Sequence, residues 1–153
     1  MKQFLILYAF IGMCFVGGPV KSYAQVSKGG FNHIALSVYD LEKSASFYRE
    51  VLLLDTLPEP FKIGKHKWFE IAPGFSLHLV ADAAEIKEHN RSTHICFSVA
   101  SIDDFIDRLD GFGIVYYNVQ HEPGKVGTRV DGVKQLYIKD PDGYWIEIND
   151  EQR

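Results

Sequence analysis

The sequence is short of cysteine and of basic residues. Its 153 residues include two cysteines, Cys14 and Cys96, and 16 lysines and arginines against 20 acidic residues, so that the formal net charge is −4. An acidic chain of this kind does not favour nucleic acid or an anionic membrane as a partner. Apolar residues are plentiful, since 46% of the chain is hydrophobic and 14% aromatic, and these amounts indicate one globular domain rather than a disordered chain.

The first 24 residues have the pattern of a secretory signal peptide. A lysine precedes the apolar run FLILYAFIGMCFVGG, and Ser22 and Ala24 form a small-x-small cleavage site. A transmembrane anchor is the alternative, but the run is shorter than the ~20 residues that a spanning helix needs. We therefore expect residues 1–24 to be removed and residues 25–153 to be exported, to a periplasm or out of the cell, without a membrane anchor. The mature chain then contains Cys96 alone and no intramolecular disulfide.

Two stretches of the remaining chain are related by a weak internal repeat. HIALSV begins at His33 and HICFSV at His94, an offset of 61 residues with four of six positions identical. Asp40 after the first stretch is a candidate N-cap, and Ser101 after the second has the spacing of a capping box with Asp104. Apolar residues then recur at helical spacing in both copies, at Leu41, Ala45, Tyr48 and Leu52 and at Ile102, Phe105, Ile106 and Leu109.

Three short strand-like runs follow each predicted helix. Gly111 or Gly113 ends the second helix, and a Gly-rich connection separates the first two runs of the second half. The runs cover residues 54–61, 67–72 and 75–81, and then 114–119, 133–140 and 144–150. The order β, α, β, β, β in each half predicts an α+β fold of two βαβββ modules, module one at about residues 31–82 and module two at about 92–150, which share one core.

Strand parity places four metal-competent side chains on equivalent faces. Alternate residues of a strand point to opposite sides, so His33 and His94 lie opposite the apolar stripes of their strands. His78, between Leu77 and Leu79, and Glu147, between Ile146 and Ile148, repeat this arrangement in the closing strand of each half. A lone strand histidine is more often structural, but four candidates at equivalent positions favour one divalent ion, which would also offset the cost of burying the Glu147 charge.

These segments resemble the vicinal oxygen chelate superfamily and, within it, glyoxalase I-like proteins. The likeness is carried by NHIALSV with SASFYREVL, by THICFSV and by the closing YIKDPDGYWIEIND, and it covers nearly all of residues 31 to 150. It implies two βαβββ modules in a cupped mixed sheet around one divalent metal ion, which could be Zn, Ni, Fe or Mn. The resemblance implies the ligands His33, His78, His94 and Glu147, with a homodimer as the family expectation.

The chemistry implied by the resemblance is metal-assisted isomerisation or lyase chemistry on a small substrate with vicinal oxygens, as in lactoylglutathione lyase. Glu147 would be both a ligand and the catalytic base. Three positions depart from glyoxalase I: His78 stands where glutamate is common, and Ser37 and Asp82 stand where an arginine and an asparagine usually help to hold glutathione. The sequence therefore leaves open which thiol, if any, the reaction uses.

Two other classes of function also stay open on the sequence. One is an Fe-dependent extradiol-type dioxygenase, which uses two histidines and one carboxylate and leaves positions for O₂. The other is a non-catalytic protein that binds a metal or a small molecule in the cup.

Overall fold

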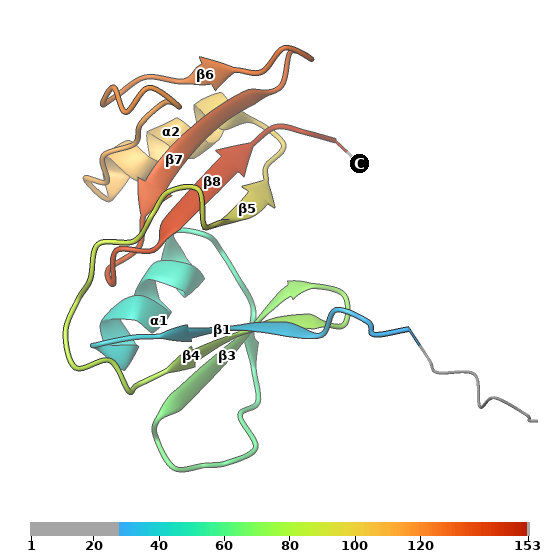
Figure 1. Cartoon of the computed structure of the whole chain (residues 1–153), viewed down its shortest axis with the longest axis vertical. Helices are drawn as coiled ribbons and strands as arrows, with labels where there is room; N and C mark the ends of the chain where they lie inside the picture. The colour runs from blue at the N-terminus through green and yellow to red at the C-terminus, as the bar shows by residue number, and fades with distance from the viewer. Residues whose placement is uncertain (1–27, 153) are drawn as a thin grey trace, which may run out of the picture. The chain divides into compact units, whose positions relative to one another are not determined.

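Two four-stranded mixed sheets, each with one helix, make up the computed structural model, which describes residues 28–152 (Figure 1). The first module consists of β1 (His33–Ser37), α1 (Leu41–Glu50), β2 (Thr56–Leu57), β3 (His66–Ala72) and β4 (Phe75–Val80). The second consists of β5 (His94–Ser98), α2 (Ile102–Gly111), β6 (Gly127–Thr128), β7 (Lys134–Lys139) and β8 (Trp145–Asn149). The predicted α+β fold of two βαβββ modules is confirmed.

Both sheets have the same topology, which explains the internal repeat. The strand orders are β1-β4-β3-β2 and β5-β8-β7-β6, and in each sheet the first strand runs parallel to the last one while the other pairs are antiparallel. The opening and closing strands of each module are therefore neighbours. This adjacency brings His33 close to His78, and His94 close to Glu147.

The predicted signal peptide, residues 1–24, lies outside the described residues. From Phe31 onward the described chain belongs to one compact unit. Within residues 28–152, α1 and α2 have ten residues each, and neither these nor any other described helix is long and apolar enough to cross a membrane.

Side-chain caps start both helices where the sequence predicts them. The Asp40 carboxylate accepts a hydrogen bond from the Lys43 backbone N–H, and the Ser101 hydroxyl accepts one from the Asp104 N–H. Gly113, at φ +66°, follows the last turn of α2 in the left-handed region that glycine tolerates. The buried faces of both helices pack in one core with the inner faces of the strands.

One predicted strand is wrong. Residues 114–119 form no strand, and Tyr117 makes only isolated bridges to Tyr137 of β7 and to Pro123. The Asn118 side-chain oxygen accepts backbone hydrogen bonds from Gln120 and Glu122, which turns the chain away from the sheet edge. The edge pairing of β7 continues instead at β6, within the predicted Gly-rich connection.

The turn before β8 connects the second module to helix α1 of the first. The Asp140 carboxylate accepts hydrogen bonds from the backbone N–H groups of Asp142 and Tyr144 and from the Tyr48 hydroxyl at 2.7 Å. Asp142 in turn accepts one from the Ser44 hydroxyl at 2.5 Å. Both carboxylates are buried, so the DPDG segment fixes the turn and links the two modules at the same time.

Candidate functional site

Three rings from three neighbouring strands form a stack in the first module. His78 of β4 is stacked on Trp68 of β3, with ring centroids 3.9 Å apart and planes 2° apart. On its other side it is stacked on His33 of β1, at 4.3 Å and 11°. Trp68 and His78 are register partners in the sheet, and both lie on the face opposite Leu77 and Leu79, which are fully buried. The face predicted from strand parity is therefore the observed one.

The second module brings His94 and Glu147 into direct contact. His94 Nε2 lies 3.2 Å from Glu147 Oε2, and His94 Nδ1 lies 2.8 Å from the backbone oxygen of Arg91. A carbonyl oxygen can only accept, so His94 Nδ1 donates to Arg91, and Nε2 is the ring nitrogen that faces the Glu147 carboxylate. A backbone carbonyl behind Nδ1 is the common second partner of a metal-binding histidine.

Two further side chains hold the Glu147 carboxylate. The Tyr137 hydroxyl donates to Oε2 at 2.8 Å, and the Asn149 amide donates to Oε1 at 3.2 Å. Cys96 Sγ lies 3.6 Å from Oε1, beside the same group. Glu147 is 8% exposed, and these partners satisfy it in the absence of a cation. Burial of the charge therefore does not by itself require an ion.

Sequence reasoning missed Trp68 and Tyr137. Each lies on the third strand of its module, opposite the candidate ligand of the closing strand, at the registers Trp68↔His78 and Tyr137↔Glu147. Each also precedes that ligand by ten residues. The offset between the modules is 69 residues for both of these pairs, against 61 for His33 and His94, so the shared ten-residue spacing is the sequence signal that relates the two rings.

The four predicted ligands form two pairs in one copy of the chain. His33 and His78 are in contact in the first sheet, and His94 and Glu147 in the second. Among residues 28–152, no three histidine, cysteine, aspartate or glutamate side chains are placed so that they could hold one ion. Each module thus supplies half of the predicted donor set.

The pKa values of His78 and Tyr137, which lie in or beside these pairs, are shifted. Burial lowers the pKa of His78, and the neighbouring His33 and His66 lower it further, so His78 is neutral at pH 7. Burial, with the hydrogen bond to Glu147 and its charge, raises the pKa of Tyr137 to about 12. The Tyr137 hydroxyl therefore keeps its proton and remains a donor to the carboxylate at physiological pH.

The sequence matches the family model of the Glyoxalase/Bleomycin resistance protein/Dioxygenase superfamily over residues 30–148. The chain belongs to this superfamily. The match covers both modules and all four candidate ligands, so the resemblance inferred from the sequence motifs is confirmed.

Relatives within the superfamily carry different chemistries. The chain is 28% identical over 150 residues to a lactoylglutathione lyase of Pseudomonas putida, covering 77% of this chain and 83% of the relative. It is 30% identical over 124 residues to the metallothiol transferase FosB of Shouchella clausii, covering 78% and 79%. A solved structure of the oxidase ChaP-H1 superposes with a TM-score of 0.66 at 26% identity, over 82% of this chain and 98% of that one. Superfamily membership therefore leaves the reaction to be argued from the site.

The donor set fits a divalent metal ion of this superfamily. Neutral imidazoles and a carboxylate suit Zn²⁺, Fe²⁺, Ni²⁺ or Mn²⁺. His94 Nδ1 lies on a backbone carbonyl with Nε2 3.2 Å from Glu147 Oε2, and His33 Nδ1 lies 2.7 Å from the side-chain oxygen of Asn32, so Nε2 is the nitrogen that each would offer to an ion. His78 differs, because its Nε2 lies 2.9 Å from the Ser76 hydroxyl.

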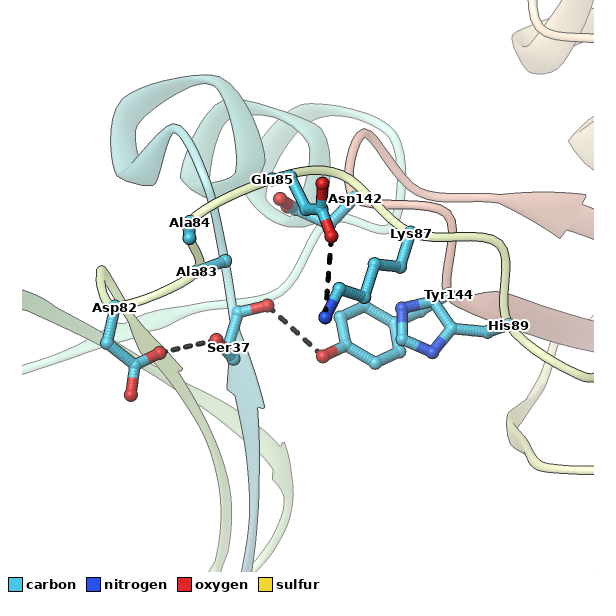
Figure 2. Close-up of a pocket in the computed structure, with 9 residues that line it drawn as sticks. All are labelled: Ser37, Asp82, Ala83, Ala84, Glu85, Lys87, His89, Asp142 and Tyr144. Atoms are coloured by element: carbon cyan, nitrogen blue, oxygen red, sulfur yellow. Dashed lines mark hydrogen bonds and ion pairs between the residues drawn. The ribbon is translucent and has the colours of Figure 1, made fainter.

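A pocket of about 310 Å³ lies beside the first module, at the end of β1 (Figure 2). Ser37 donates a short hydrogen bond to Asp82, and the Tyr144 ring is stacked on His89 with centroids 3.9 Å apart. Lys87 also lines the pocket, but its ammonium lies 3.6 Å from a Glu85 oxygen. These walls offer more negative than positive charge to a ligand.

Proposed function

We propose that the protein is a divalent-metal-dependent enzyme of the glyoxalase-like lyase or isomerase type, which acts on a small substrate with two vicinal oxygens. The observation that carries the proposal is the His94–Glu147 pair, in which a buried carboxylate is held at both oxygens by Tyr137 and Asn149 and is faced by His94 Nε2. A carboxylate positioned in this way is suited to proton transfer. The similarity to a lactoylglutathione lyase supports this class of reaction.

We propose that His33, His94 and Glu147 hold the ion, with His78 as the fourth candidate. The two pairs lie in different modules, and one copy of the described chain does not gather three donors. We therefore propose that the first module of one chain meets the second module of another chain in a homodimer with two equivalent sites. A C₂ dimer forms both sites from the same pair of surfaces.

In the proposed reaction each residue has a defined task. The bound ion would polarise a substrate oxygen and so acidify the adjacent C–H. Glu147 removes the proton from one carbon and returns it to its neighbour. The Tyr137 hydroxyl donates to Oε2 and the Asn149 amide to Oε1, so the carboxylate keeps one orientation through both steps.

The thiol partner of this reaction is less well matched by the chain. A glutathione carboxylate at the end of β1 would meet the Ser37–Asp82 pair, in which a serine stands where glyoxalase I commonly has an arginine and a charged aspartate where it has an asparagine. Two carboxylates that meet without a cation between them repel each other, which disfavours binding of glutathione at this position. We propose a neutral or amine-bearing thiol, or a hydroxycarbonyl compound without a thiol, as the substrate.

The test begins with metal analysis of the purified protein, followed by assays with methylglyoxal and a panel of thiols. Glu147→Gln should lower turnover of the substrate so identified by about 100-fold or more, because a positioned base is lost. Asp107→Asn, at an exposed carboxylate of α2, is the control and should leave turnover unchanged. Wild-type turnover in a metal-loaded Glu147→Gln protein would contradict the proposed role.

A mixing experiment tests the shared site. His33→Ala and Glu147→Gln each disable one module, and a mixed dimer contains one site with both changes and one site with neither. Equal mixing after reversible dissociation should restore about a quarter of the wild-type activity if sites form between chains. If both ligand pairs of a site belong to one chain, no activity returns.

A second candidate is an Fe²⁺-dependent dioxygenase, and the contact of His78 with Ser76 favours it. If His78 keeps its hydrogen bond with Ser76 and does not bind the ion, the remaining donors are two histidines and one carboxylate. Non-haem iron oxygenases use this set of donors. Oxygen uptake by the Fe²⁺-loaded protein with catechols distinguishes this reaction from isomerisation, which consumes no O₂.

A further inference from the structure

The parallel rings of His33 and His78 conflict with the binding of one ion by both. An imidazole lone pair lies in the plane of its ring, so a bound metal must lie close to that plane. The two planes differ by 11°, and their centroids are 4.3 Å apart. Lone pairs in two nearly parallel, stacked planes do not converge on a point about 2.1 Å from each nitrogen, which is the usual metal–nitrogen distance.

The two rings use different nitrogens in their hydrogen bonds, and only His33 uses the same one as His94, its equivalent in the repeat. His33 has Nδ1 on the Asn32 side-chain oxygen, and His94 has Nδ1 on the Arg91 carbonyl with Nε2 facing Glu147 Oε2 at 3.2 Å. His78 uses Nε2 on Ser76. The two opening-strand histidines therefore share one arrangement, and the closing-strand histidine departs from it.

The stack also explains why a flat ring is present at position 78. Trp68 covers the far face of His78 at 3.9 Å, and the Phe61 ring meets Trp68 edge-on at 6.0 Å. One face of the His33 ring is thereby supported by His78, which is itself backed by Trp68. Such packing limits the rotation of His33 and keeps its Nε2 in one direction, as outer partners of metal ligands do.

We propose that His78 is a positioning residue, which acts with Trp68 through the His33 ring, and that it is not a fourth metal ligand. This assignment rests on the proposed function, because it presumes an ion bound at His33, His94 and Glu147. It gives the centre two imidazoles and one carboxylate and leaves more positions for substrate oxygens than a four-ligand site would.

The test makes the same substitution, histidine to phenylalanine, at positions 33 and 78 and compares the two variants. His33→Phe and His78→Phe each keep a flat ring and remove both nitrogens, and His78→Ala removes the ring. Co²⁺ affinity is measured by calorimetry for the three variants and the wild-type protein, and the visible absorption of bound Co²⁺ reports its coordination. Circular dichroism checks that each variant is folded.

We expect His78→Phe to bind Co²⁺ within about 3-fold of the wild-type affinity and with the same absorption spectrum, since it removes only a packing partner and replaces it with another ring. His78→Ala should weaken binding by about 10-fold, at the lower end of the range for outer partners of metal ligands. His33→Phe should weaken it more than either. A His78→Phe protein that loses affinity as His33→Phe does, or a His78→Ala protein that binds as the wild type does, overturns the assignment.

A measurement on the unmodified protein does not depend on the folding of any variant. Electron paramagnetic resonance of bound Cu²⁺ should show coupling to two imidazole nitrogens, and coupling to three overturns the assignment. A wild-type protein that binds no Co²⁺ or Cu²⁺ contradicts the proposed function itself. Tight binding with coupling to three nitrogens contradicts only the role assigned to His78 and leaves the proposed function standing.

Discussion

Asp140 should make the stability of the protein fall with rising pH. Its carboxyl is 6% exposed and lies in the turn that connects β7 and β8 to helix α1. Burial raises the pKa of Asp140 to about 6, against 3.8 for the free group, although hydrogen bonds from Tyr48 and from backbone N–H groups of Tyr144 and Asp142 oppose the shift. The charged form is therefore the less favourable one in the folded protein.

The size of the effect follows from the difference between the two pKa values. Between about pH 4 and pH 6 the native state holds a proton on Asp140 that the unfolded state has lost, so stability decreases as pH rises through this window. A shift of about 2 units corresponds to about 3 kcal/mol in the free energy of unfolding. Below the window both states are protonated and above it both are charged, so the contribution is constant on either side.

Asp140→Asn is the matching perturbation, because the amide resembles the protonated acid. Its oxygen can accept from the Asp142 and Tyr144 N–H groups, and its nitrogen can donate to the Tyr48 hydroxyl oxygen. Urea unfolding of variant and wild type at about pH 4, 5, 6 and 7 gives the free energies. The difference should shift in favour of Asp140→Asn by about 2 kcal/mol between pH 4 and pH 7, less than the full effect because the unfolded group is already partly ionised at pH 4.

Other titrating groups cancel in this difference, and Asp107→Asn, at an exposed position of α2, serves as the control that should show no shift. A difference between Asp140→Asn and wild type that stays constant within about 0.5 kcal/mol across the range would refute the reasoning.

Gly143→Ala should destabilise the protein more than Gly113→Ala, because both glycines have positive φ but a Cβ at Gly143 would lie 2.3 Å from a backbone oxygen while Gly113 faces open space. We expect about 1–2 kcal/mol for Gly113→Ala and at least twice that for Gly143→Ala in urea unfolding, and equal losses would contradict the close contact. Tyr137→Phe should lower turnover or Co²⁺ affinity by about 10- to 100-fold by releasing Glu147, and unchanged values in both measurements would show that the hydroxyl does not position it. Mass spectrometry of protein from the native host should find Gln25 at the N-terminus, whereas an intact first residue in the soluble fraction would argue against signal cleavage and export.

The local elements were predictable because their signals are local. Asp40 and Ser101 cap helices through backbone groups only three residues further on, and strand parity depends on alternation within five or six residues. The segment 114–119 has the same apolar character, but the side chain of Asn118 bonds to the following turn and removes it from the sheet. A competition between a strand and a turn at one residue is decided by such contacts, which apolar patterning does not contain.

The candidate site was predictable only in part, since pairing of residues within a module follows from topology while ring orientation does not. The parallel first and last strands of each βαβββ unit place His33 beside His78 and His94 beside Glu147. The stacking of His78 between two rings and the hold of Tyr137 on Glu147 depend on side-chain rotamers. Residue types in the sequence therefore identified the candidate metal donors. Only the geometry distinguishes a donor side chain from a side chain that holds the donor in place.

Division of the donors between two modules has a thermodynamic consequence for the proposed assembly. An ion that needs the first module of one chain and the second module of another binds the dimer and not the separate chains, so it stabilises association as any ligand stabilises the state it prefers. At a free ion concentration 100 times the dissociation constant this contribution is about 2.7 kcal/mol. Glu147, already satisfied by Tyr137 and Asn149, does not force a cation into the isolated chain. In the proposed dimer the ion is therefore not needed to satisfy Glu147, and metal availability would regulate the amount of dimer.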